Sequence, residues 1–255
     1  MVHFVGAGPG AEDLITVRGL NYLRQADVII YAGSLVNPAL LGAAKQNCKI
    51  HNSAYMTLEE VIEVMAEAER EGLVTVRLHT GDPSIYGAIR EQMDELDKRG
   101  IAFSVCPGVS SLFGAASALQ IEYTLPEVSQ SVIITRAEGR TPVPERESIR
   151  TLAAHQSTMV LFLSSGLAGK VREELLAGGY HAETPVAVVY KATWPEEMIL
   201  HTTVEKLPDD MERAGIDKTA LIVVGNVLGN EYQKSKLYDA SFSTGFRAKH
   251  EEFET

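Results

Sequence analysis

Three turns of this sequence combine glycine, proline and small polar residues in a way that suits ligand binding. Gly6–Gly10 (GAGPG), Thr80–Pro83 (TGDP) and Cys106–Ser111 (CPGVSS) each follow an apolar run. Glycine lets a backbone approach a ligand closely, and free N–H groups at the start of a helix attract a carboxylate. Open α/β sheets bind ligands at the carboxyl ends of their strands. The turns therefore predict a ligand site in which backbone groups do much of the binding.

The first turn has the glycine spacing of a dinucleotide-binding fingerprint, with Ala11 at its third position. Two features disfavour that interpretation. Pro9 donates no N–H to a pyrophosphate, and no acidic residue ends the expected second strand, Val28–Tyr31. An NAD(P)-binding Rossmann protein stays an alternative, but a different ligand is favoured.

The second turn also has a purely structural interpretation. Asp82 and Pro83 are typical of an N-cap and a first helical position, ahead of an apolar stripe from Ile85 to Leu96. We therefore expect Asp82 to cap a helix, whether or not it also contacts a ligand. Ser110 has the same double interpretation, since serine at this place caps a tightly packed helix.

The elements that must position these turns alternate along the first half of the chain. A helix is expected over Thr57–Glu71, where Thr57 and Glu60 form a capping box. Alternation of strands and amphipathic helices implies a largely parallel sheet covered on both faces. The expected strands are Val2–Val5, Val28–Tyr31, Lys49–Asn52, Val74–His79 and Ala102–Cys106.

The second half repeats the α/β style without sharing a sequence period. The expected helices are Leu167–Ala177 and Val204–Ala214, and the expected strands are Val132–Thr135, Met159–Leu163, Val186–Tyr190 and Leu221–Val224. Residues 119–130 contain a proline and lack periodicity. The sequence thus predicts an α/β domain at 1–118, a linker at 119–130, a second α/β domain at 131–229 and a polar tail at 230–255.

Composition limits the partners. The 255 residues carry a net charge of −11, which argues against a nucleic-acid surface. Cys48 and Cys106 are the only cysteines, and the seven histidines show no metal-ligand spacing. No apolar run is long enough for a membrane span, and the N-terminus lacks the features of a signal peptide. We expect a soluble cytoplasmic protein without a bound metal.

Several segments, in order, resemble the signatures of the tetrapyrrole methylases, which transfer a methyl group from S-adenosylmethionine to a macrocycle. No single one of them is specific, but their succession from residue 2 to residue 225 is. The matching stretches are Gly6–Leu20, Arg77–Gly87, Cys106–Ser111, Leu161–Gly166, Val189–Glu197 and Thr219–Gly225.

The resemblance implies two α/β domains, each a mostly parallel or mixed sheet flanked by helices, with the active site in the cleft between them. It implies S-adenosylmethionine as cofactor, S-adenosylhomocysteine as product, no metal and a homodimer. Asp82 and Tyr86 are the candidates for a role beside the reacting groups, Asp82 in positioning and Tyr86 facing the macrocycle. The implied cofactor-binding residues are Pro9, Thr80, Gly81, Asp82, Ile85, Ser110, Ser111, Leu163, Ala192 and Ala220.

The stretches Tyr31–Pro38, Thr80–Gly87 and Lys191–Glu197 are similar to the branch of the family that methylates precorrin-4, or its cobalt form, at carbon 11. Other branches stay open: methylation of another ring carbon, of a diphthamide precursor as in diphthine synthase, or of a ribose in ribosomal RNA. A non-catalytic tetrapyrrole carrier is a further alternative.

A carboxylate-rich corrinoid substrate needs a local positive field on this acidic protein. The candidates are Arg18, Lys191, Arg136 and Arg140, although for each residue taken singly a solvated surface charge is the better interpretation.

Overall fold

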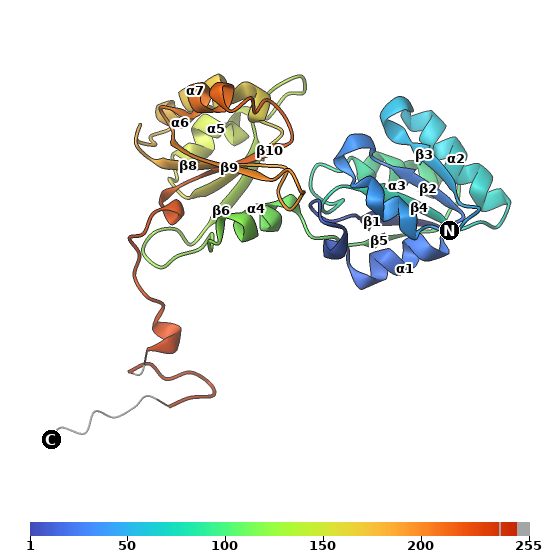
Figure 1. Cartoon of the computed structure of the whole chain (residues 1–255), viewed down its shortest axis with the longest axis horizontal. Helices are drawn as coiled ribbons and strands as arrows, with labels where there is room; N and C mark the ends of the chain where they lie inside the picture. Colours follow the sequence, from blue (N-terminus) through green and yellow to red (C-terminus); the bar gives the residue numbers. More distant parts are fainter. Residues whose placement is uncertain (240, 249–255) are drawn as a thin grey trace. The chain divides into compact units, whose positions relative to one another are not determined.

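The structure, a computed structural model, describes residues 1–239 and 241–248. The chain forms two compact units: Met1–Leu119 with Val189–Ile199, and Gln120–Val188 with the chain from Leu200 onward. Figure 1 shows one sheet in each part of the chain. The segment 189–199, expected in the second domain, thus groups with the first unit, while the domain boundaries at 118 and 131 stay a prediction.

The first sheet is parallel, as expected. Its strands run in the order β3-β2-β4-β1-β5, and every neighbouring pair is parallel. All five carboxyl ends therefore lie at one edge. The strands are β1 (Val2–Gly6), β2 (Val28–Tyr31), β3 (Lys49–Asn52), β4 (Thr75–His79) and β5 (Phe103–Cys106).

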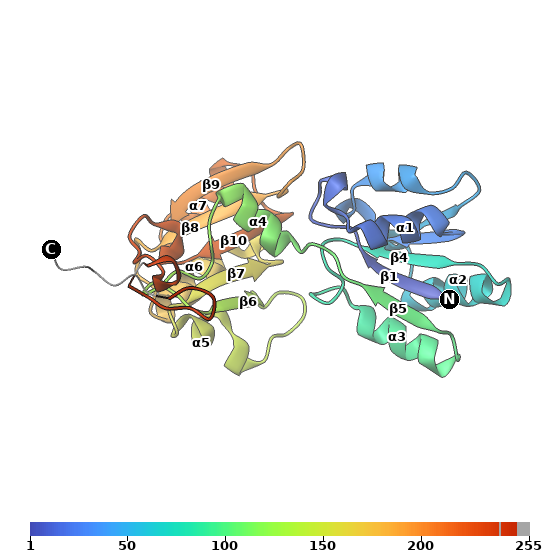
Figure 2. The ribbon, with the colours of Figure 1, turned by 90° about the horizontal axis from the view of Figure 1, so that it is seen from below.

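Helices cover both faces of this sheet (Figures 1 and 2). On one face α1 (Val17–Gln25) buries Leu23 against strand residues such as Ile29 and Leu78. On the other face α2 (Leu58–Arg70) and α3 (Ile89–Lys98) pack against Phe4 and its neighbours. The capping box of Thr57 and Glu60 is present at the start of α2, which confirms that prediction.

The connections from β1 and β4 explain why their loops meet. The chain passes from β1 through α1 to β2, and from β4 through α3 to β5. These crossovers run in opposite directions over opposite faces of the sheet. The loops that begin them consequently leave adjacent strands side by side at the carboxyl edge. The last strand, β5, leads into α4 (Ser111–Leu119).

The second sheet is mixed. Its order is β6-β7-β10-β8-β9, with β6 and β7 parallel and β7 and β10 antiparallel. Figure 1 shows α5, α6 and α7 on the same side of it, and α6 contacts both of the others. The elements are β6 (Val132–Arg136), α5 (Ile149–Ala153), β7 (Thr158–Phe162), α6 (Ala168–Ala177), β8 (Pro185–Tyr190), β9 (Met198–Thr203), α7 (Leu207–Arg213) and β10 (Ala220–Val224).

Two elements of the second half escaped the sequence analysis. β9 is the outer strand of its sheet and has no fully buried residue, so it lacks a continuous apolar run. α5 has only five residues, too few for a helical period. The helix expected from Val204 begins at Leu207, with Pro208 in its first turn.

Candidate functional site

Three strands of the first sheet end close together, each followed by or ending in a glycine. A Cβ built on Gly6 would lie 2.6 Å from the Cα of Gly108 and 2.6 Å from the carbonyl oxygen of Gly81. A Cβ on Gly108 would lie 2.2 Å from that same oxygen. No side chain fits at these two positions, so glycine is required for the ends of β1, β4 and β5 to approach one another.

The loops after β1 and β4 are hydrogen-bonded to each other. Gly81 N donates to Gly8 O at 2.8 Å, Gly8 N donates to Gly81 O at 3.3 Å, and Ala7 N donates to His79 O at 2.7 Å. Gly8 and Gly81 have φ of +85° and +59°, which glycine adopts without strain. The two predicted turns therefore form one backbone structure.

Residues distant in sequence hold the first turn from outside. The indole Nε1 of Trp194 donates to Pro9 O at 3.1 Å, and Asn37 Nδ2 donates to Gly10 O at 2.8 Å. Ala11 N donates to Thr193 Oγ1 at 3.0 Å. A Cβ on Gly10 would lie 2.1 Å from Cδ1 of Trp194, so the ring packs directly on the turn. Sequence reasoning did not foresee these roles of Asn37 and Thr193.

This hydrogen bonding bears on the dinucleotide alternative. The N–H groups of Ala7, Gly8 and Ala11 are already donated within the protein, and Pro9 has none. A pyrophosphate needs several free N–H groups at such a turn. The turn as folded does not supply them.

The segment that contributes Trp194 is itself held by charged side chains. Glu197 accepts a hydrogen bond from Thr193 N at 2.6 Å. Lys191 Nζ lies 5.4 Å from the centre of the Trp194 ring and 3.6 Å from a carboxylate oxygen of Glu196. Lys191, one of the candidates for a positive field, is thus engaged with its own neighbours. Buried Ala192 sits between these contacts in sequence.

Asp82 does not cap a helix, which corrects the prediction. The next helix begins only at Ile89, because Gly87 packs tightly against Pro83 and the residues on either side of Gly87, Tyr86 and Ala88, have φ of +56° and +49°. Asp82 instead stabilises the loop. Its Oδ1 accepts from Ser84 N at 2.9 Å and also from Ser84 Oγ, and its Oδ2 accepts from Gly108 N at 2.8 Å.

These hydrogen bonds set the charge of Asp82. Partial burial raises the pKa of the carboxyl, but the hydrogen bonds from Ser84 and Gly108 lower it by more, so its pKa lies below the usual value. Asp82 is therefore an anion near neutral pH. Tyr86, on the same loop, is half exposed in a left-handed conformation that costs free energy and is often found at functional sites.

The third predicted turn and the helix that follows it pack against the first turn. Ser110 is buried, and its Oγ accepts from Leu112 N at 3.3 Å at the start of α4, as expected for a capping serine. A Cβ on Gly114 would lie 2.9 Å from Cβ of Pro9, so this helix approaches the glycine turn closely. By contrast, a Cβ on Gly81 would meet Ser111 N and Ser110 Cα at 3.5 and 3.6 Å, ordinary contact distances. Gly81 thus faces the backbone of Ser110 and Ser111 at contact distance, without the crowding found at Gly6 and Gly108.

Two predicted residues belong to the second unit. Leu163 follows the end of β7, and Ala220 begins β10. The antiparallel register that pairs Leu161 with Ile222 brings both residues to the same edge of that sheet. Leu163 is 66% exposed with φ of +52°, while Ala220 is buried.

The first unit therefore contains eight of the ten predicted cofactor-binding residues, and the second unit contains two. Within the described residues we find no group of side chains suited to hold a metal ion and no helix long and apolar enough to cross a membrane. His79, the histidine at the end of β4, is not a candidate acid or base. Burial, with the nearby Arg77 cation, lowers its pKa to about 3.

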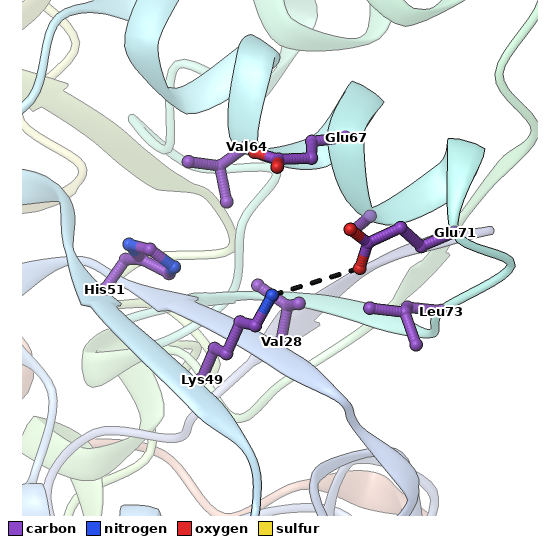
Figure 3. Close-up of a pocket in the computed structure, with 8 residues that line it drawn as sticks. Val28, Lys49, His51, Val64, Glu67, Glu71 and Leu73 are labelled. Carbon is purple, nitrogen blue, oxygen red and sulfur yellow. Dashed lines mark ion pairs between the residues drawn. The ribbon is translucent and has the colours of Figure 1, made fainter.

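A cavity lies away from these turns. It has a volume of about 120 Å³ and lies between β3 and α2 (Figure 3). Lys49 points across it toward Glu71, with Nζ 3.9 Å from the carboxylate oxygen, and His51 lines its side. None of the predicted site residues lines this cavity.

Comparison with known proteins gives consistent matches over almost the whole chain. The family described as Tetrapyrrole (Corrin/Porphyrin) Methylases matches residues 1–208. The cobalt-precorrin-4 C(11)-methyltransferase of Methanocaldococcus jannaschii is 56% identical over 253 residues, which cover 99% of this chain and 98% of that protein.

Two solved structures extend the likeness to the fold. The X-ray structure of a cobalamin biosynthetic enzyme, cobalt precorrin-4 methyltransferase, has a TM-score of 0.88 and 50% identity and covers 90% of this chain and 96% of that one. A uroporphyrin-III C-methyltransferase from Thermus thermophilus, complexed with S-adenosylhomocysteine, has a TM-score of 0.76 and 25% identity and covers 89% of this chain and 98% of that one.

Proposed function

This chain belongs to the tetrapyrrole (corrin/porphyrin) methylase family, and we propose that it transfers a methyl group from S-adenosylmethionine to carbon 11 of precorrin-4 or its cobalt form. The observation that supports this most strongly is the high identity to a cobalt-precorrin-4 C(11)-methyltransferase along nearly the full length of both chains. The reaction would serve cobalamin biosynthesis, as in the solved relative.

Methyl transfer from a sulfonium donor does not require a dedicated acid or base in the protein. The sulfonium donor supplies an electrophilic methyl group, and an electron-rich ring carbon displaces the sulfur in line. The new carbon–carbon bond forms as the carbon–sulfur bond breaks, and the electron pair stays on sulfur to give S-adenosylhomocysteine. Holding both reactants in a near-attack arrangement supplies much of the rate acceleration. The residues of the site therefore orient the reactants and exclude water.

The first unit offers surroundings that fit this donor. The turn at Pro9 has few free N–H groups, which suits a ligand without a pyrophosphate. Gly81 and the backbone of Ser110 and Ser111, which are all predicted cofactor contacts, lie close together. The anionic Asp82 favours a cationic ligand by electrostatic attraction, whether through its sulfonium or its amino group.

On this basis we assign the cofactor to the ten predicted residues and the macrocycle to a surface that includes Tyr86. In the first unit the proposed contacts are Pro9, Thr80, Gly81, Asp82, Ile85, Ser110, Ser111 and Ala192, and in the second unit they are Leu163 and Ala220.

The reaction can be tested by the position of the transferred methyl group. The protein is incubated with S-adenosylmethionine carrying a ¹³C-methyl group and with precorrin-4 or cobalt-precorrin-4, and the product is analysed by carbon NMR. We expect the label at carbon 11, and comparing the two substrates shows which form is used. Label at carbon 17 or carbon 1, or transfer only to a protein or RNA, would contradict the proposal.

We also propose that the protein acts as a cytoplasmic homodimer with no metal of its own. Symmetric dimers are the commonest oligomers, and this is the state that the family resemblance implied. Light scattering at micromolar concentration should give twice the mass of one 27.7 kDa chain. A mass of one chain would contradict the dimer without affecting the proposed reaction.

A further inference from the structure

A buried arginine is linked by hydrogen bonds to the end of the loop that carries Tyr86. Arg77, on β4, is only 7% exposed and forms no ion pair with any of the residues described. Burial lowers its pKa to about 10, so the guanidinium is still charged at neutral pH. Burying a charge without an opposite partner is costly, because the desolvation penalty is not offset by an ion pair. The presence of Arg77 in the core therefore points to a role in holding neighbouring groups in place.

The contacts of Arg77 lead to the loop. Its Nε donates to Gln92 Oε1 at 3.0 Å, and its Nη1 donates to Ile30 O at 3.2 Å. Gln92, on α3, is 5% exposed and uses its other amide atom as a donor, with Nε2 3.0 Å from Ala88 O. A continuous chain of hydrogen bonds thus runs from strand β2 through Arg77 and Gln92 to the residue before α3.

The loop that ends at Ala88 needs such support. Tyr86 and Ala88 have φ of +56° and +49°, and a Cβ on Gly87 would lie 2.2 Å from Pro83 O. Conformations of this kind persist only where their surroundings fix them. The near end of the loop is fixed by the hydrogen bond from Gly108 N to the Asp82 carboxylate. The far end is fixed by the hydrogen bond from Gln92 Nε2 to Ala88 O. Tyr86 lies between the two anchors.

We propose that Arg77 and Gln92 are positioning residues for methyl transfer: they hold the far end of the 82–88 loop so that Tyr86 seats the macrocycle. This inference rests on the proposed function and deepens it. Of the proposed cofactor contacts only Ile85 lies between the two anchors, and Gly81 and Asp82 are held at the near end, so loss of the far anchor should impair use of the corrinoid far more than cofactor affinity.

Gln92→Glu separates the two contacts of Gln92. The carboxylate still accepts from Arg77, and gains an ion pair with it, but it cannot donate to Ala88 O. We expect kcat/KM for the corrinoid to fall at least tenfold, the affinity for S-adenosylhomocysteine by calorimetry to change less than twofold, and the melting temperature not to fall. Hydrogen exchange should become faster at residues 83–88 and stay unchanged elsewhere, a readout that does not depend on activity.

A second variant guards against an artefact of the new charge. Arg77→Met with Gln92→Met removes the polar pair together, and replacing buried polar partners by apolar residues of similar size is often neutral for stability. This double variant should fold and show the same kinetic loss. Full corrinoid turnover in either folded variant, or unchanged exchange at 83–88, would overturn the positioning role. If instead the unaltered protein methylates neither precorrin, the proposed function fails, and the exchange measurement still decides whether Gln92 anchors the loop.

Discussion

The two sheets of this protein differ in how they gather residues that can bind a ligand. In the parallel sheet all carboxyl ends share one edge, and the ends of β1, β4 and β5 bring most of the predicted residues into a single unit. In the mixed sheet, antiparallel β7 and β10 send their carboxyl ends to opposite edges, and only Leu163 and Ala220 meet. Strand direction thus decides how many loops can contribute to one site.

The glycines of the predicted turns can be compared with glycines in open positions elsewhere in the chain. A Cβ added to Gly6, Gly10 or Gly108 would lie closer than 3 Å to other atoms, whereas one added to Gly169 or Gly215 in the second unit would have nothing within 4 Å. Glycine permits close approach of neighbouring groups at Gly6, Gly10 and Gly108, and serves only helix or turn geometry at Gly169 and Gly215. This difference can be tested by substitution.

The largest effect is expected at Gly108. In Gly108→Ala the new methyl group would meet the backbone of Gly81 and Gly6, and forced overpacking of this kind costs about 3 kcal/mol. Urea unfolding should show this loss. Gly169→Ala, in the open α6 position, should stabilise by roughly 0.5 kcal/mol. Equal stability of the two variants would remove the distinction between crowded and open glycines.

The next effect concerns Asp82. Asp82→Asn should lower the free energy of unfolding by about 1 kcal/mol at pH 7, because the amide cannot accept all the hydrogen bonds from Ser84 and Gly108. The folded-state pKa of Asp82 lies below its unfolded value, so its stabilisation is fully present above about pH 4 and is lost as the pH falls further. The two proteins should therefore converge in stability as the pH is lowered below that value.

The matched carboxylate is Asp94, which forms an exposed ion pair with Arg90 on α3. Exposed pairs contribute little, so Asp94→Asn should change stability by less than about 0.5 kcal/mol. A difference between Asp82→Asn and the parent that persists undiminished at low pH would show that the carboxylate charge is not what stabilises the loop.

A free-energy change of similar size is expected for Trp194, here in the binding of the cofactor. Trp194→Phe removes the donor to Pro9 O, a hydrogen bond worth about 1 kcal/mol, so affinity for S-adenosylhomocysteine should fall about fivefold in calorimetry. Tyr180→Phe removes a donor to Ser157 O in the second unit. It should reduce stability alone. Equal losses of affinity in both variants would contradict a specific role of the glycine turn.

The smallest effect has the opposite sign. Leu163→Gly relieves a left-handed backbone and should raise the stability by roughly 0.5 kcal/mol, while removing an exposed side chain proposed to contact the cofactor. Affinity for S-adenosylhomocysteine should fall about twofold. Gln120→Gly relieves a similar φ of +54° after α4 and should leave affinity unchanged. A stability gain with unchanged affinity in Leu163→Gly would exclude that contact.

The sequence predicted the parallel sheet well because local signals define it. The apolar strands and the capping box of Thr57 and Glu60 are encoded within a few neighbouring residues, and both were confirmed. The capping role of Asp82 was wrong, since the left-handed Tyr86 and Ala88 interrupt the helix that the apolar stripe suggested. Gly87, inside the stripe, is the local sign of that break, but the left-handed conformation of its neighbours depends on the folded loop.

The supports of the site were beyond sequence reasoning for a related reason. Thr193 and Trp194 reach the glycine turn across more than 180 residues, and the Arg77–Gln92 contact joins a strand to a helix in the core. Such contacts depend on the packing of whole elements. Residue types pointed to the turns as a ligand site, which stays a prediction, whereas the side chains that hold the turns could not be read from the sequence.

The proposal that the cofactor site belongs to the carboxyl edge of the parallel sheet can be tested by calorimetric titration of S-adenosylhomocysteine into Gly81→Leu and Gly215→Leu. Both positions have left-handed backbones, with φ of +59° and +67°, so both variants bear a similar conformational cost of about 1–2 kcal/mol. Circular dichroism should show both folded. Only Gly81→Leu extends a side chain toward Ser110 and Ser111, and we predict that it loses binding while Gly215→Leu keeps the affinity of the parent. Undiminished affinity in Gly81→Leu would contradict the account.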